Sequence, residues 1–196
     1  MLILAYLNLP NLITLAGMLC GLSSMILSLH AYPGFALLAL LCAGICDLLD
    51  GHVARRMSAH GKRSDAQSQF GQTLDSLVDV INFGMAPMVF IYALQPSPSV
   101  SFYLCAGFYV ACAVLRLAYF TVHGLLEDSR GKYYSGLPVT YAALLLPVTT
   151  LPGLLSWPLS WLLWLLHVWP LLIGSLFISR LRFRKPGSAR TVSAGA

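Results

Sequence analysis

The sequence predicts an all-α integral membrane protein, and three observations lead to this fold class. Of the 196 residues, 58% are hydrophobic and 10% are charged, and the mean hydropathy is +0.75. Soluble domains carry about 25% charged residues, so a soluble fold is excluded. The apolar residues form six windows, each close to the ~20 residues that a membrane-spanning helix needs. Lysines and arginines gather in alternate connections between these windows, as expected when helices cross a bilayer back and forth.

Six transmembrane helices with short connections are therefore expected. We place them at residues 9–29, 34–55, 69–93, 100–123, 138–156 and 159–179. Prolines such as Pro33, Pro96 and Pro158 mark or approach the ends of the windows. The first ten residues carry no basic side chain before the apolar run, so no cleaved signal peptide is expected. The helices make up one domain, residues 1–185, and residues 186–196 are expected to form a disordered cytoplasmic tail.

The basic residues predict the orientation of the helices. They follow the second, fourth and sixth windows, and the connections after the first, third and fifth windows hold none. They are Arg55, Arg56, Lys62, Arg63, Arg130, Lys132, Arg180, Arg182, Arg184, Lys185 and Arg190. The positive-inside rule then places both termini in the cytoplasm. The net charge of +5 can also attract anionic lipid headgroups on that face, although topology alone requires these residues.

Four of the seven acidic residues lie beside apolar stretches, near the cytoplasmic ends of the second and third windows. They are Asp47, Asp50, Asp75 and Asp79. A carboxylate near hydrocarbon is costly without a partner, and converging carboxylates repel one another. Mg²⁺ and Mn²⁺ prefer carboxylate and phosphate oxygens, so we expect one or two such ions here. Pairing of aspartates with arginines at helix ends is the structural alternative, but it leaves Asp79 unexplained.

The spacing of these residues predicts two facing acidic surfaces at the same membrane depth. Residues three and four apart share a helix face, which groups Asp47 with Asp50 and Asp75 with Asp79. Small residues on the same faces leave room for a ligand, and an arginine beside them can contact a phosphate bidentately. These residues are Gly51, Ala54, Gly71 and Arg55. Metal, arginine and a spare carboxylate are the parts needed for transfer at a diphosphate.

This pattern resembles the signature of the CDP-alcohol phosphotransferase, or phosphatidyltransferase, family. All eight signature positions match, from Asp47 to Asp79. The chain departs from the family in the 15 residues between Arg55 and Gly71, which is more than the family usually has. The extra residues lie within Met57–Gln69, which is polar, and we interpret this stretch as an extended cytoplasmic loop.

The resemblance implies a role for each signature residue. Asp47, Asp50 and Asp75 would ligate metal, and Asp79 would ligate metal and act as the catalytic base. The CDP group would be held by Gly51, Ala54, Arg55 and Gly71. The resemblance also implies a fold of six transmembrane helices, usually a homodimer, whose site opens on the cytoplasmic side of the cell membrane. The lipid tails of CDP-diacylglycerol would leave sideways into the bilayer.

Further segments resemble the phosphatidylserine synthase branch of the family, among them Pro10–Thr14 and Asn82–Pro87. This implies L-serine as the acceptor alcohol and CMP as the leaving group. Arg116 lies inside a predicted helix and is the candidate to hold the serine carboxylate. Pairing with the aspartate cluster, or extension to the cytoplasm, is an equal alternative for Arg116. Asn82 is the second candidate for acceptor binding.

Two alternative functions stay open from the sequence. The same chemistry could use glycerol 3-phosphate, an inositol phosphate or choline as the acceptor. A phosphorylated acceptor needs several basic residues near the site, and the later windows supply only Arg116. A divalent-cation transporter could use the same carboxylates, although such transporters often show internal repeats and none is evident here. Metal-dependent release of CMP would separate the enzyme from the transporter. No nucleic-acid partner is expected.

Overall fold

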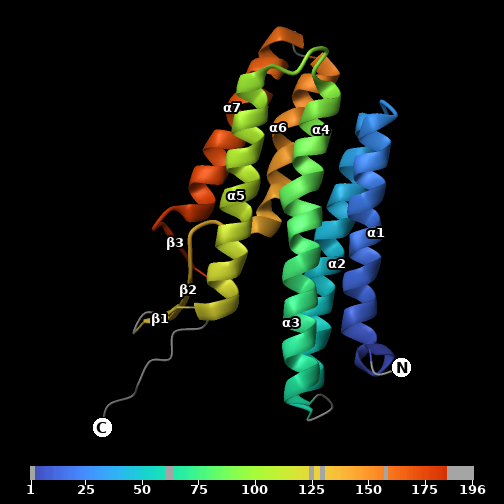
Figure 1. Cartoon of the computed structure of the whole chain (residues 1–196), viewed down its shortest axis with the longest axis vertical. Helices are drawn as coiled ribbons and strands as arrows, with labels where there is room; N and C mark the ends of the chain where they lie inside the picture. Colours follow the sequence, from blue (N-terminus) through green and yellow to red (C-terminus); the bar gives the residue numbers. More distant parts are fainter. Residues whose placement is uncertain (1–2, 61–63, 124–125, 129–130, 157–158, 185–196) are drawn as a thin grey trace.

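The computed structural model describes residues 3–60, 64–123, 126–128, 131–156 and 159–184 as a bundle of long helices with a small sheet at one end (Figure 1). The helices are η1 (Ile3–Tyr6), α1 (Leu9–Leu29), α2 (Pro33–Ala59), α3 (Asp65–Asp79), η2 (Val80–Met85), α4 (Ala86–Leu94), α5 (Val100–His123), η3 (Val139–Tyr141), α6 (Ala142–Ser156) and α7 (Leu159–Ile178). The strands are β1 (Leu126–Asp128), β2 (Gly131–Ser135) and β3 (Arg182–Arg184). The predicted tail, 186–196, lies outside the described residues.

Each of the six predicted windows is helical. Within the described residues, four continuous helices are long and apolar enough to cross a membrane, namely Leu9–Leu29, Pro33–Ala59, Asp65–Leu94 and Val100–His123. Two further apolar helices are shorter, Val139–Gly153 and Leu162–Ile178. The protein therefore has the helices of an integral membrane protein. Six crossings and the cytoplasmic placement of the termini stay predictions.

The expected loop at Met57–Gln69 is wrong, because helices extend into this stretch from both sides. Helix α2 continues to Ala59, and α3 begins at Asp65. Ser64 caps α3 through a reciprocal pair of hydrogen bonds. The Gln67 backbone N–H donates to Ser64 Oγ at 3.2 Å, and the Ser64 backbone N–H donates to Gln67 Oε1 at 3.2 Å. Such a capping box satisfies N–H groups that a helix start leaves without partners, so a polar sequence can continue the helix beyond the membrane.

A three-stranded antiparallel sheet, in the order β1-β2-β3, was not predicted. The all-α class therefore holds for the bundle but is incomplete for the connections. The strand β3, which follows α7, pairs with β2 in the connection between α5 and α6. Gly136 makes the turn from β2 toward α6 at a φ of +78°, where a side chain would also collide with the Phe177 carbonyl. Local periodicity could not reveal pairing between segments so distant in the sequence.

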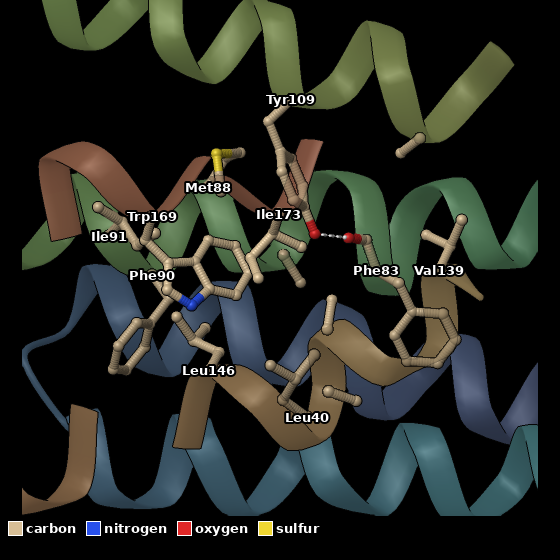
Figure 2. Packing of buried hydrophobic residues seen from close by; sticks show 14 of the residues in the cluster. Leu40, Phe83, Met88, Phe90, Ile91, Tyr109, Val139, Leu146, Trp169 and Ile173 are labelled. Atoms are coloured by element: carbon tan, nitrogen blue, oxygen red, sulfur yellow. Dashed lines mark hydrogen bonds between the residues drawn. The ribbon is translucent and has the colours of Figure 1, made fainter. Parts of the chain in front are cut away.

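A π-helical turn, η2, joins α3 to α4 and begins directly after Asp79. The hydroxyl of Tyr109 on α5 donates to the Phe83 carbonyl in this turn at 2.6 Å (Figure 2). Tyr109 and Phe83 are both fully buried, so the bond satisfies a carbonyl that water cannot reach. The contact fixes α5 against the π turn. Turns of this kind are rare and are frequent at functional sites.

The apolar core lies between α2, α4, α5, α6 and α7. Aromatic side chains fill its centre. The ring centroid of Tyr109 is 5.4 Å from that of Trp169 and 5.3 Å from that of Phe177. Gly174 on α7 lets α5 come close, because a Cβ there would lie 3.2 Å from the Tyr109 Cα. Helix α1 packs mainly against α2, outside this core.

Candidate active site

A cavity of about 570 Å³ lies between α2, α3, α5 and the start of α6. Its polar wall contains the charged residues Asp47, Arg55, Asp75, Asp79 and Arg116. Its apolar wall is formed mainly by α2 and by η3 with the start of α6. The lining apolar residues from these elements include Leu41, Ile45, Leu48, Val139 and Leu144. Charged groups and apolar side chains therefore line the same cavity.

Three carboxylates converge in this cavity. One oxygen from each of Asp47, Asp75 and Asp79 lies within 4.8 Å of the others. Asp47 comes from α2, and the other two come from successive turns of α3. Asp79 is 8% exposed, and Asp75 and Asp47 are partly buried. The predicted meeting of the two acidic helix faces is therefore seen for these three residues.

Asp50 stands apart from the group of three. It is 4% exposed and does not line the cavity. Its Oδ2 accepts a hydrogen bond from Thr14 Oγ1 on α1 at 2.5 Å. Sequence reasoning noted Pro10–Thr14 only for its resemblance and assigned Thr14 no part in the site. A hydroxyl residue among the apolar residues of α1 was the available sign, but its partner depends on how α1 packs against α2.

Gly51 and Arg55 occupy adjacent turns of α2, and both line the cavity. A Cβ at Gly51 would lie 3.3 Å from Arg55 Nη1, so the absent side chain leaves space for the guanidinium group. Ala54 and Gly71, the other two expected CDP-binding residues, do not line the cavity. Gly71 is buried in α3, and Ala54 is partly buried. The structure thus brings two of the four expected CDP-binding residues to the cavity.

The two candidate acceptor-binding residues lie in different places. Arg116 is 6% exposed and lines the cavity from α5, with its Cζ 5.7 Å from the ring centroid of Phe120. Asn82 is 1% exposed, does not line the cavity and faces α1. A Cβ at Gly21 would collide with the Asn82 side chain. Asn82 lies inside the π turn η2, whose changed pitch after Asp79 accounts for its position away from the acidic face.

The donor set of this cavity fits a hard divalent cation. All three converging ligands are carboxylates, and Mg²⁺ and Mn²⁺ prefer such oxygen donors to nitrogen or sulfur. The site also leaves room for phosphate oxygens, because the cavity continues past the carboxylates toward Arg55. Three partly or largely buried carboxylates this close would repel one another strongly without a cation. The residues present therefore match the metal that the sequence led us to expect.

Comparisons with known proteins agree with this geometry. Residues 7–169 match the sequence model of the family described as CDP-alcohol phosphatidyltransferase. A CDP-diacylglycerol–serine O-phosphatidyltransferase of Mycobacterium leprae (strain TN) is 33% identical over 188 residues, which cover 90% of this chain and 58% of the relative. The archaetidylserine synthase of Methanothermobacter thermautotrophicus is 34% identical over 157 residues, covering 79% of this chain and 62% of the relative.

A shorter relative extends the comparison. The CDP-diacylglycerol–serine O-phosphatidyltransferase of Bacillus subtilis (strain 168) is 31% identical over 141 residues, covering 71% of this chain and 73% of the relative. The alignments with the first two relatives span only 58% and 62% of their lengths. The family match covers most of the chain, including the whole of α2, α3 and α5. The chain therefore belongs to the CDP-alcohol phosphatidyltransferase family.

Proposed function

We propose that this protein is a CDP-diacylglycerol–serine O-phosphatidyltransferase, which forms phosphatidylserine and CMP. One observation carries the proposal: three carboxylates and two arginines share a cavity whose other wall is apolar. A lipid diphosphate needs both surfaces, one for its phosphates and one for its chains. The names of the relatives support serine as the acceptor.

The carboxylates of Asp47, Asp75 and Asp79 would hold the metal, Mg²⁺ or Mn²⁺. When bound, such an ion neutralises charge on the diphosphate and on the departing CMP. Asp50, behind them against α1, adds a fourth negative charge to this end of the bundle. We keep all four aspartates as metal-site residues, with Asp50 in a supporting position.

Asp79 is the proposed base. It takes the proton from the serine hydroxyl, and the serine oxygen forms a bond to the lipid-side phosphorus of CDP-diacylglycerol. The bond between that phosphorus and the bridging oxygen breaks, and CMP leaves with the electron pair. Arg55 binds the phosphate of the leaving CMP, in the space beside Gly51. Ala54 and Gly71 support the CDP site by letting the helices pack closely.

The lipid chains would lie along the apolar wall. Ile45, Leu48 and Leu144 line the cavity and are also 56%, 70% and 53% exposed, so the wall continues to the outer surface of the bundle. Gly44 on α2 approaches α6 closely there, because a Cβ would lie 3.1 Å from the Ala143 Cβ. The exposed lining residues beside this contact support lateral entry of the lipid along α2 and α6.

Arg116 is the proposed partner of the serine carboxylate, because it lines the same cavity as the three carboxylates and does so from another helix, α5. Asn82 faces α1, which argues against direct contact with the acceptor. We further propose six crossings with both termini in the cytoplasm, a cytoplasmic active site in the cell membrane, and a homodimer as in the family. The ends of α2 and α5, the start of α3 and the sheet lie toward one end of the bundle, as this topology requires (Figure 1).

The test is an acceptor panel on the purified full chain. Radiolabelled CDP-diacylglycerol and Mn²⁺ are supplied with one acceptor at a time: serine, glycerol 3-phosphate, inositol phosphate or choline. Serine-dependent release of CMP with formation of phosphatidylserine is expected. Product formation with another acceptor alone would reject serine and keep the transferase. Metal uptake into vesicles without any release of CMP would favour the transporter.

A further inference from the structure

The aspartate that stands apart from the converging three is held by a residue outside the signature. Asp50 and Thr14 are 4% and 5% exposed, so water hardly reaches either side chain. Thr14 Oγ1 lies at hydrogen-bonding distance from Asp50 Oδ2, and also 3.1 Å from the Pro10 carbonyl. A hydroxyl has one proton to donate. The carboxylate is the stronger acceptor and the nearer one, so the Thr14 proton belongs to Asp50.

Helix α1 holds Thr14 firmly in this place. Asn8 caps the helix, because its Oδ1 accepts from the Asn11 backbone N–H at 3.2 Å. The Asn11 side chain donates to the Tyr6 carbonyl at 2.8 Å, and the Tyr6 ring stacks on Phe70 of α3 with centroids 4.9 Å apart. The N-terminal segment is thereby fixed to α3 while Thr14 reaches α2. The hydroxyl that donates to Asp50 therefore lies near a helix start that is fixed both by its own cap and by the contact with α3.

We propose that Thr14 is a positioning residue that fixes the orientation of the Asp50 carboxylate for metal binding by the aspartate site. The inference rests on the proposed function, because it assumes a divalent metal at this site and a part for Asp50, one of the four proposed metal-site residues, in binding it. A metal-site side chain that is already held by a hydrogen bond loses less conformational freedom when the metal binds. Substitution of residues that form such bonds to metal ligands commonly weakens metal affinity 10–100-fold. Without the hydroxyl, the Asp50 carboxylate turns more freely and the metal site becomes weaker.

The structure offers a matched control in the same helix pair. Ser24 is also buried on α1, and its hydroxyl donates to the Ala36 carbonyl of α2 at 2.8 Å. Ser24→Ala removes a buried bond between α1 and α2 that is remote from the aspartates. Thr14→Val removes the bond to Asp50 with little change of shape, and Thr14→Ser restores a donor. A general loosening of the two helices would affect the Ser24 and Thr14 variants alike.

The test measures Mn²⁺ binding to the full chain in detergent by electron paramagnetic resonance, without substrate, and then the Mn²⁺ dependence of CMP release. We expect Thr14→Val to raise the Mn²⁺ dissociation constant ~10-fold or more, in line with other outer partners of metal ligands. Thr14→Ser should recover most of the affinity, and Ser24→Ala should leave it unchanged. Equal affinity of Thr14→Val and the parent would overturn the inference, as would equal weakening by Ser24→Ala or a parent that binds no Mn²⁺.

The same data separate the inference from the proposed function. A parent that binds Mn²⁺ tightly but forms no phosphatidylserine would reject the proposed reaction. If Thr14→Val still weakened Mn²⁺ binding in that case, the positioning role would stand. If phosphatidylserine formed and Thr14→Val left Mn²⁺ binding unchanged, the reaction would stand and the positioning role would fail.

Discussion

The half of the bundle formed by α1 to α4 and the half formed by α5 to α7 line the same cavity with different side chains. The first half supplies the three converging carboxylates and Arg55. The second half supplies Arg116 together with apolar and aromatic residues such as Phe120 and Val139. The first half therefore carries the acidic groups and one arginine together with part of the apolar wall, and the second half completes that wall and adds Arg116.

The two halves are also held together differently. Buried polar bonds tie α1 to its neighbours, as in Thr14 with Asp50 and Ser24 with the Ala36 carbonyl. Aromatic packing around Tyr109 and Trp169 dominates between α5 and α7. Polar bonds fix direction, whereas apolar packing is less directional. Substitutions in the first half should therefore change the chemical step and metal binding, and those in the second should change acceptor affinity or stability.

The largest effect is expected from Asp79→Asn. The substitution keeps the shape of the side chain and removes the proposed base, so turnover should fall on the order of 10²–10⁴-fold. Binding of CDP-diacylglycerol should be largely kept. The measurement is the rate of CMP release together with the affinity for labelled CDP-diacylglycerol. Asp65→Asn is the control, because Asp65 is an exposed carboxylate at the start of the same helix. A near-parental rate in the Asp79 variant would remove this residue from the mechanism.

Removal of one proposed metal-site carboxylate should come next. Asp75→Asn and Asp50→Asn should both lose Mn²⁺-stimulated activity, because each removes negative charge from the aspartate site. Asp75→Asn should show the larger loss, since Asp75 belongs to the converging three and Asp50 lies behind them. Titration of activity with Mn²⁺ measures the difference. Full activity of the parent in excess chelator would contradict the metal site itself.

A smaller and more selective effect is expected from the second half. Arg116→Met removes the charge with little change of length, and the apparent KM for serine should rise ~10-fold or more. That factor corresponds to a lost charged hydrogen bond of about 1.5–3 kcal/mol. The KM for CDP-diacylglycerol should change much less. A parallel rise of both constants would instead indicate that Arg116 supports the aspartate cluster.

The smallest effect on catalysis is expected from Tyr109→Phe, which should mainly lower stability. The variant leaves the buried Phe83 carbonyl without the hydroxyl that donates to it at 2.6 Å. The expected loss is about 1–3 kcal/mol of unfolding free energy, with Mn²⁺ affinity unchanged. Thermal unfolding in detergent and Mn²⁺ titration measure the two quantities. Weakened Mn²⁺ binding would show that the π turn, which follows Asp79, transmits changes from α5 to the carboxylates.

Much of the site could be predicted because its residues recur at helical spacing within single helices. Four-residue spacing places Asp75 and Asp79 on one face, and the expected membrane topology puts that face at the same depth as Asp47. Features that depend on contacts between distant segments could not be predicted. The bond from Thr14 to Asp50 requires the packing of α1 on α2, and the pairing of β3 with β2 requires the bundle to be formed.

One wrong expectation and one unforeseen placement have local physical causes. The polar stretch after Arg55 resembled a loop because its residues are hydrophilic, but a capping box at Ser64 starts α3 early. The acceptor role of Asn82 stays a prediction, but its position against α1 was not foreseen, because it lies in a π turn that interrupts the helix after Asp79. Hydrophobicity and helical period describe regular helices well. They do not reveal a helix that extends beyond its apolar window, or a π turn that changes the helical pitch.

The extension of α2 and α3 beyond the apolar windows has a consequence for the path of the lipid substrate. Asp47 lies about 21 Å along α2 from Pro33 at the usual α-helical rise, and Asp79 lies at a similar distance from Leu94 across η2 and α4. In the proposed orientation, Pro33 and Leu94 mark the outer edge of a ~30 Å hydrocarbon layer. Both carboxylates then lie about 8 Å inside its cytoplasmic edge. A phospholipid whose phosphates normally lie at that edge needs only a short descent, with its tails remaining in the leaflet. In the same orientation, the ends of α2 and α3 that extend past the apolar windows lie on the aqueous side from which a soluble acceptor would arrive. The lipid and the acceptor would then reach the site from different phases.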